Sequence, residues 1–211
     1  MPRGRNRRAS RLQKPPADVF LNIPYDSGFQ EIYLAYLAGI SAFGLVPRTT
    51  LEIPGGTRRL DRIFSLIQNC QYSVHDLSRV ELDRKRPPTP RFNMPFELGL
   101  SVAWERIGRS KHVWFVFEAK NRRLAKSLSD LNGTDAYIHD GKVMGVFREL
   151  GNAIVRPGRQ PSVRQMRRIY EDLRSSLPDI LRRAGTKSLF QARVFREICV
   201  VASASADKIV K

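Results

Sequence analysis

Two acidic side chains, Asp76 and Glu97, stand where an α/β protein places groups that act on a ligand. Asp76 ends an apolar segment typical of a buried strand, and Glu97 lies near the start of the helical segment that follows. In an open parallel sheet, ligands bind beyond the carboxyl ends of the strands. A carboxylate at such a site can act as a nucleophile or stabilise positive charge that develops in a substrate. The two acids therefore predict a catalytic site at this edge.

The start of the helix favours an ionised Glu97. Asn93 is a natural N-cap, and Pro95 is tolerated so early in a helix. The positive end of the helix dipole stabilises a negative charge in the first turn, which suits a nucleophile or cation stabiliser better than an acid. The alternative is that Glu97 only stabilises the helix, and position alone leaves both interpretations open.

Other polar residues are expected at the same edge. Asn22, Tyr25 and Asp26 follow the first predicted strand. Pro-Gly-Gly-Thr at 54–57 resembles half of a phosphate-binding loop, in which Gly55 and Gly56 would expose backbone N–H groups, and Arg58 and Arg59 follow it. This segment lacks the Gly-Lys-Ser/Thr of a Walker loop, so a plain turn is the alternative. The predicted substrate-binding residues are Asn22, Tyr25, Asp26, Gly55, Gly56, Arg58, Arg91 and Asn93.

The three histidines are weaker candidates for functional residues than the acids. His75 and Asp76 are neighbours on a predicted strand, so their side chains point to opposite faces and one of them faces the cleft. We expect that one to be Asp76, with His75 packed or hydrogen-bonded. His112 and His139 show no metal-ligand spacing, so neither a metal nor a bound cofactor is expected.

Short apolar segments alternate with helical ones along the middle of the chain. The predicted strands are 18–23, 45–51, 72–77, 113–117 and 136–139, and the predicted helices are 29–44, 57–67, 94–106, 124–131 and 143–154. This order predicts an α/β fold with a parallel five-stranded sheet and helices on both faces. Several large apolar residues are expected in its core, namely Phe96, Leu100, Trp114, Phe115 and Phe117.

The net charge of +17 belongs to the two ends of the chain, because residues 15–155 contribute only +3. We expect residues 1–16 to form a disordered basic arm, 17–155 an α/β domain, and 156–211 a basic helical extension interrupted at Pro178 and Gly185. The amphipathic helices of the extension are expected to pack on the α/β domain or to form a homo-oligomer. The basic ends would also allow non-specific attraction to nucleic acid, although no recognition motif is present.

Several protein classes are not expected. The two cysteines do not suggest a disulfide scaffold. No apolar run approaches the ~18 residues of a membrane span, and no apolar segment follows the arginine-rich start as in a secretory signal. A cytoplasmic protein without a membrane partner is therefore expected.

The sequence around these residues resembles two related families. Asp-Val-Phe-Leu-Asn at 18–22, Pro-Gly-Gly at 54–56 and Phe-Glu-Leu at 96–98 follow the plan of TIR domains. Phe-Glu-Leu-Gly at 96–99 is similar to the catalytic helix of nucleoside 2-deoxyribosyltransferases. The resemblance spans roughly residues 18–140 and implies a flavodoxin-like fold.

The resemblance implies cleavage or transfer at the N-glycosidic bond of a nucleotide, with NAD as the first substrate to test. It assigns Glu97 to the ribosyl carbon and Asp76 to the ribose hydroxyls, and it places Asp26 and residues 53–57 beside the cleft. Assembly into oligomers and a role in bacterial antiviral defence are also implied. The alternative is a catalytically silent nucleotide-sensing or assembly module with the same cleft.

Two departures from the deoxyribosyltransferase pattern bear on this choice. Phe20 stands where those enzymes carry an aromatic hydroxyl that orients the glutamate, and Tyr25 is the nearest substitute. Arg91 stands where they carry an Asp, six residues before Glu97. An arginine at that place suits a phosphate-bearing ligand, because a guanidinium group binds phosphate through two parallel hydrogen bonds.

Overall fold

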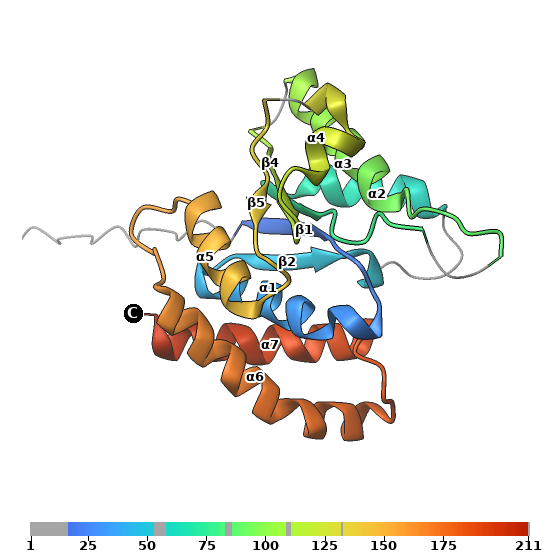
Figure 1. Cartoon of the computed structure of the whole chain (residues 1–211). Helices are drawn as coiled ribbons and strands as arrows, with labels where there is room; N and C mark the ends of the chain where they lie inside the picture. The colour runs from blue at the N-terminus through green and yellow to red at the C-terminus, as the bar shows by residue number, and fades with distance from the viewer. Residues whose placement is uncertain (1–16, 53–57, 83–85, 109–110, 132, 211) are drawn as a thin grey trace, which may run out of the picture.

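The computed structural model describes residues 17–52, 58–82, 86–108, 111–131 and 133–210 (Figure 1). A parallel five-stranded sheet lies at the centre, with the strand order β2-β1-β3-β4-β5. The strands are β1 (Asp18–Asn22), β2 (Val46–Thr49), β3 (Tyr72–Asp76), β4 (Val113–Glu118) and β5 (Tyr137–Ile138). This is the flavodoxin-like α/β fold that the sequence predicts.

Helices cover both faces of the sheet. One face carries α1 (Gln30–Ala42) and α5 (Val143–Ala153), and the other carries α2 (Arg59–Asn69), α3 (Asn93–Ile107) and α4 (Arg123–Ser127) (Figure 1). Three short 3₁₀ helices, Ser27–Phe29, Thr50–Glu52 and Ser129–Leu131, lie in the connections. Alternation along β1 matches the two layers, since Val19 and Leu21 join the α1 side while Phe20 packs with α2.

The extension forms a second layer outside α1. Helices α6 (Val163–Ala184) and α7 (Ala192–Ile209) pack against each other and against α1 (Figure 1). Every residue from Ile32 to Ala42 is buried, because α1 lies between the sheet and this layer. The extension therefore shares one core with the α/β domain, which is one of the two arrangements that its amphipathic pattern allows.

The predicted break at Pro178 is wrong. Helix α6 continues through Pro178 and ends at Gly185, which has the left-handed φ of 66° typical of a helix C-terminus. Proline removes the N–H that would bond to the carbonyl four residues earlier. The helix tolerates this loss because Pro178 is exposed while Leu173 and Ile180, on either side, are buried in the core.

The face that α3 buries also differs from the prediction. Phe96 is 53% exposed, whereas Met94, Glu97, Leu98 and Ser101 are buried. Apolar residues occur all round α3, so the sequence alone does not define which face turns inward. The described helices include none with the length and apolar character needed to cross a membrane.

Candidate functional site

Glu97 lines a pocket at the carboxyl end of β1, between the start of α2 and the start of α3. We call it the Glu97 pocket. Six other polar residues line it, namely Asn22, Tyr25, Thr50, Arg59, Arg91 and Asn93. Its volume is about 120 Å³, below the roughly 300–1,000 Å³ of sites that enclose a drug-sized ligand. The described residues therefore enclose less space than a drug-sized ligand occupies.

The Glu97 side chain is buried without compensation. It is 6% exposed, and no described residue donates a hydrogen bond to its carboxyl group. Burial raises the pKa of Glu97 to about 7, because a carboxylate loses hydration when it is buried. The positive charge of Arg59 opposes this increase but does not overcome it. A buried acid with a perturbed pKa in a pocket is a typical mark of a functional site.

The expectation that the helix start keeps Glu97 ionised is wrong. Helix α3 begins at Asn93, its N-cap is Phe92, and no side chain caps it. Glu97 is thus the fifth helical residue, and the stabilising effect of the dipole fades within the first turn. Desolvation therefore exceeds the dipole effect, and Glu97 exists in both protonation states near neutral pH.

Two arginines give the pocket its positive charge. Arg59, at the start of α2, donates a hydrogen bond of 3.3 Å from Nη2 to Thr50 Oγ1. Arg91, which precedes α3, lies 4.0 Å from Asp26 Oδ2 and is half exposed. Both guanidinium groups lie at the rim, where they can bind a phosphate. Asp26 itself does not line the pocket but holds Arg91 beside it.

Tyr25 supplies a hydroxyl group near the acid. Thr50 Oγ1 lies 3.4 Å from the Tyr25 hydroxyl, which accepts the hydrogen bond. Burial, together with the nearby negative charge of Glu97, raises the pKa of Tyr25 to about 12. The phenol is therefore protonated at neutral pH and can donate a hydrogen bond within this pocket.

Asp76 does not line the Glu97 pocket. Its side chain is 0% exposed and lies on the α1 face of the sheet, where it accepts a hydrogen bond of 2.7 Å from the Tyr36 hydroxyl. His139 Nε2 lies 3.1 Å from the same carboxylate oxygen, and the backbone N–H of Ser78 donates to the other. Both oxygens of Asp76 are thus occupied within the fold, so the expectation that it faces the Glu97 cleft is wrong. His75 faces that side instead.

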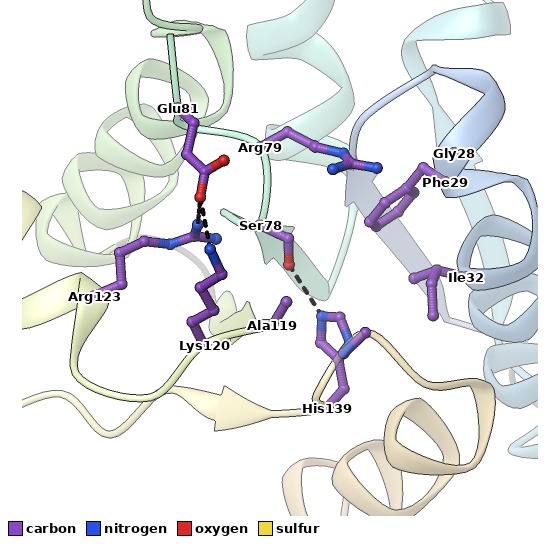
Figure 2. A pocket seen from close by; sticks show the side chains of 11 residues that line it. Gly28, Phe29, Ile32, Ser78, Arg79, Glu81, Ala119, Lys120, Arg123 and His139 are labelled. Atoms are coloured by element: carbon purple, nitrogen blue, oxygen red, sulfur yellow. Dashed lines mark hydrogen bonds and ion pairs between the residues drawn. The ribbon is translucent and has the colours of Figure 1, made fainter.

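A second pocket, of about 190 Å³, lies beyond Asp76 and is lined by Ser78, His139 and three cations. We call it the His139 pocket. Figure 2 shows Lys120 and Arg123 converging on Glu81, with oxygen-to-nitrogen distances of 2.9 Å to each. The third cation, Arg79, lies 3.4 Å from Asp26. All three cations therefore already have acidic partners within the protein.

Ser78, His139 and Asp76 do not form a catalytic triad. In a triad the acid and the hydroxyl contact different ring nitrogens. Here Ser78 Oγ and Asp76 Oδ2 both lie 3.1 Å from Nε2, and Nδ1 accepts a hydrogen bond from the backbone N–H of Gly141. The proton therefore resides on Nε2, and the ring has no free nitrogen with which to activate the serine.

The structure thus brings together half of the predicted site. Glu97, Asn22, Tyr25, Arg91 and Asn93 line one pocket. Arg58 is exposed, directly precedes α2 and does not line the Glu97 pocket. Gly55 and Gly56, like the predicted arm at 1–16, lie outside the described residues. No cluster of three or more His, Cys, Asp or Glu side chains able to hold a metal ion occurs in the described part of the chain.

Two polar lining residues, Thr50 and Arg59, were not among the predicted site residues. Thr50 directly follows β2, at the same edge of the sheet as the other site residues. Its position at the end of a predicted strand could have marked it as a candidate. Arg59, not Arg58, enters the pocket, and only the phase of α2 decides between these neighbours. Comparisons of the chain with protein-family models, curated proteins and solved structures gave no match.

Proposed function

We propose that this chain cleaves or transfers at the N-glycosidic bond of a nucleotide, with NAD as the leading substrate. The observation that carries the proposal is the buried Glu97 carboxyl group, which has no hydrogen-bond partner among the described residues and lines a pocket flanked by two arginines. The resemblance of residues 96–99 to the catalytic helix of nucleoside 2-deoxyribosyltransferases supports the same assignment.

The chemistry requires a negative charge beside the ribosyl carbon. As the bond between C1′ and the base nitrogen breaks, its electron pair leaves with the base and positive charge develops on the sugar. An ionised Glu97 stabilises that charge or traps the carbon as an ester. The oxygen of a water or acceptor hydroxyl then bonds to C1′, the Glu97 carboxylate is released where an ester has formed, and the proton of the attacking hydroxyl passes to solvent. With a pKa of about 7, roughly half of Glu97 is ionised at neutral pH.

The arginines are proposed to bind the phosphate groups. Arg59 and Arg91 lie on the pocket with Glu97, and guanidinium groups favour phosphate over neutral ligands. From the same resemblance we propose a cytoplasmic protein that assembles with its own copies and takes part in bacterial antiviral defence. Its basic ends would add only non-specific attraction to nucleic acid.

One observation favours a catalytically silent nucleotide sensor as the second candidate. Phe20 is 0% exposed and packs edge-on against His75, with ring centroids 6.1 Å apart. Strand β1 therefore has no hydroxyl to orient Glu97, and Tyr25 would have to serve from the loop. A sensor would bind the same nucleotide and leave it intact.

The test is base release from NAD and related nucleotides by the wild type and by Glu97→Gln, under conditions in which both proteins are fully folded. The amide keeps the shape of the side chain but removes its charge, so we expect turnover to fall by about 10²–10³ while nucleotide affinity is retained. Equal turnover by the two proteins would refute the catalytic assignment. Binding without release by either protein would establish the sensor.

A further inference from the structure

A row of buried hydrogen bonds starts at the Glu97 pocket and runs along β3. The Asn22 amide nitrogen lies 2.8 Å from the Met94 carbonyl oxygen and 2.9 Å from His75 Nδ1. His75 Nε2 in turn lies 2.9 Å from Ser73 Oγ. These three side chains are at most 3% exposed, so water does not compete for their hydrogen bonds.

The row continues to the amino end of the sheet. Ser73 Oγ lies 3.0 Å from His112 Nε2, and His112 Nδ1 lies 2.9 Å from the carbonyl oxygen of Cys70. His112 is 3% exposed. Asn22 and His75 are also direct partners in the pairing of β1 with β3, which fixes their separation.

The carbonyl oxygens at the two ends determine the direction of every bond. A carbonyl only accepts, so the amide group facing Met94 must be the Asn22 NH₂, which leaves its second hydrogen for His75 Nδ1. At the other end, His112 must be protonated on Nδ1 to donate to Cys70. His75 then donates from Nε2 to the serine hydroxyl, which donates to His112 Nε2.

Burial keeps both rings neutral, as this pattern requires. It lowers the pKa of His75 to about 3, and the positive charge of His112 would act in the same direction. Burial also lowers the pKa of His112. Each ring therefore has one donor and one acceptor nitrogen, and each is used once.

The pattern leaves one atom free. Both hydrogens of the Asn22 amide are used, whereas its Oδ1 receives no hydrogen bond from any described residue. This oxygen is not among the buried polar atoms that lack a partner, so it retains access to the space around it. Asn22 lines the Glu97 pocket, and Oδ1 is therefore an acceptor held ready for a donor there.

We infer that Asn22 Oδ1 accepts a hydrogen bond from a sugar hydroxyl of the nucleotide, and that His75 is the positioning residue that fixes the amide. The inference rests on the proposed function and gives its substrate class, which is nucleotides with an intact ribose. Asn22 takes the place that the sequence assigned to Asp76. A deoxy analogue would leave Oδ1 without a donor, and an unsatisfied buried polar group is costly.

The test measures the dissociation constants of nicotinamide mononucleotide and of its 2′-deoxy and 3′-deoxy forms. We expect the wild type to bind at least one deoxy form about 10- to 100-fold more weakly. Asn22→Leu should bind all three alike, and Thr50→Val, in the same pocket but outside the row, should keep the wild-type ratio. The ratio is used because Asn22 also holds the start of α3.

His75→Phe provides a second variant, since a phenyl ring keeps the contact with Phe20 but removes both bonds. It should reduce the ratio, and ¹⁵N spectra of the wild type should show His75 protonated only on Nε2. Equal binding of all three nucleotides by the wild type, no binding of any, or an unchanged ratio in Asn22→Leu would overturn the inference. Base release without this discrimination would leave the proposed function intact, and discrimination without release would refute only the enzyme.

Discussion

The Glu97 pocket and the His139 pocket lie on opposite faces of the same sheet edge and use their polar groups differently. Around His139, Asp76 accepts hydrogen bonds from the Tyr36 hydroxyl and the Ser78 backbone N–H and lies beside the His139 ring, and the lining cations have acidic partners. Around Glu97, one carboxyl group and the Oδ1 of Asn22 receive no hydrogen bond from the described protein. Partnered groups stabilise the fold, whereas partnerless groups reduce stability and are available to a ligand. On this comparison the His139 pocket has a structural role, and the Glu97 pocket is the better candidate for binding a ligand.

Asp76→Ala should have the largest effect and should act on stability. It leaves the buried Tyr36 hydroxyl and the Ser78 backbone N–H without their acceptor and removes the carboxylate beside the His139 ring, which should cost about 3–5 kcal/mol of unfolding free energy. Urea denaturation measures this loss. Asp130→Ala, at an exposed site, is the control and should change stability by about 0.5 kcal/mol or less. A folded Asp76→Ala protein as stable as the wild type would remove the structural role.

Glu97→Gln should increase the stability of the protein, whereas Asp76→Ala should decrease it. Since burial raises the folded-state pKa of Glu97 from 4.5 to about 7, the unfolded chain loses its proton first as pH rises. The stability that the neutral acid contributes is complete below pH 4.5 and is lost as pH rises through about 7. The variant should thus be up to about 3 kcal/mol more stable than the wild type at pH 8.

The matching measurement is denaturation of both proteins at pH 4 and pH 8. The difference should vanish at pH 4, where both states of the wild type are protonated. Glu171→Gln, on the exposed surface of α6, should show no such pH dependence beyond the small contribution of its ion pair with Arg167. A Glu97→Gln protein that is less stable at pH 8 would mean that the carboxylate is stabilised by the fold.

A smaller effect should distinguish Arg59 from Arg91, namely the change that each substitution causes in the pKa of Glu97. Arg59→Gln removes a positive charge that lowers the pKa of Glu97, so that pKa should rise further. Arg91 does not act on this pKa, and Arg91→Gln should leave it unchanged. Carboxyl ¹³C titration of Glu97 distinguishes them, and equal shifts would show that the two arginines act alike. Both variants should weaken nucleotide binding.

The sequence predicts the sheet and its layers because alternation and helical spacing repeat over many residues. It does not predict side-chain selection at the site, which depends on single steps of rotation. Phe96 and Glu97 are neighbours, yet Phe96 is exposed and Glu97 is buried. The sequence does not predict this, because apolar residues occur on every side of α3 and no polar face marks the side that meets solvent. His75 and Asp76 do point to opposite faces, as alternation requires. Which of them meets α3 depends on the side to which the chain crosses.

The partnerless state of Glu97 is a property of the assembled fold. The sequence places an acid near a helix start, which favours ionisation, and only packing against the sheet shows that desolvation exceeds this effect. The extension offered a readable signal, because residues 32–42 are apolar on every side. A helix of that kind requires cover on both faces, and α6 and α7 supply it.

The most direct test of the central claim, that Glu97 acts as a buried carboxylate, is the pH dependence of kcat/KM for base release from NAD between pH 5 and 9. We predict a tenfold rise per pH unit at low pH, which levels off with a midpoint near 7. The midpoint should move upward in Arg59→Gln, and Glu97→Gln should lack the rise. A rate that falls as pH increases, or a midpoint that Arg59→Gln leaves in place, would contradict the account.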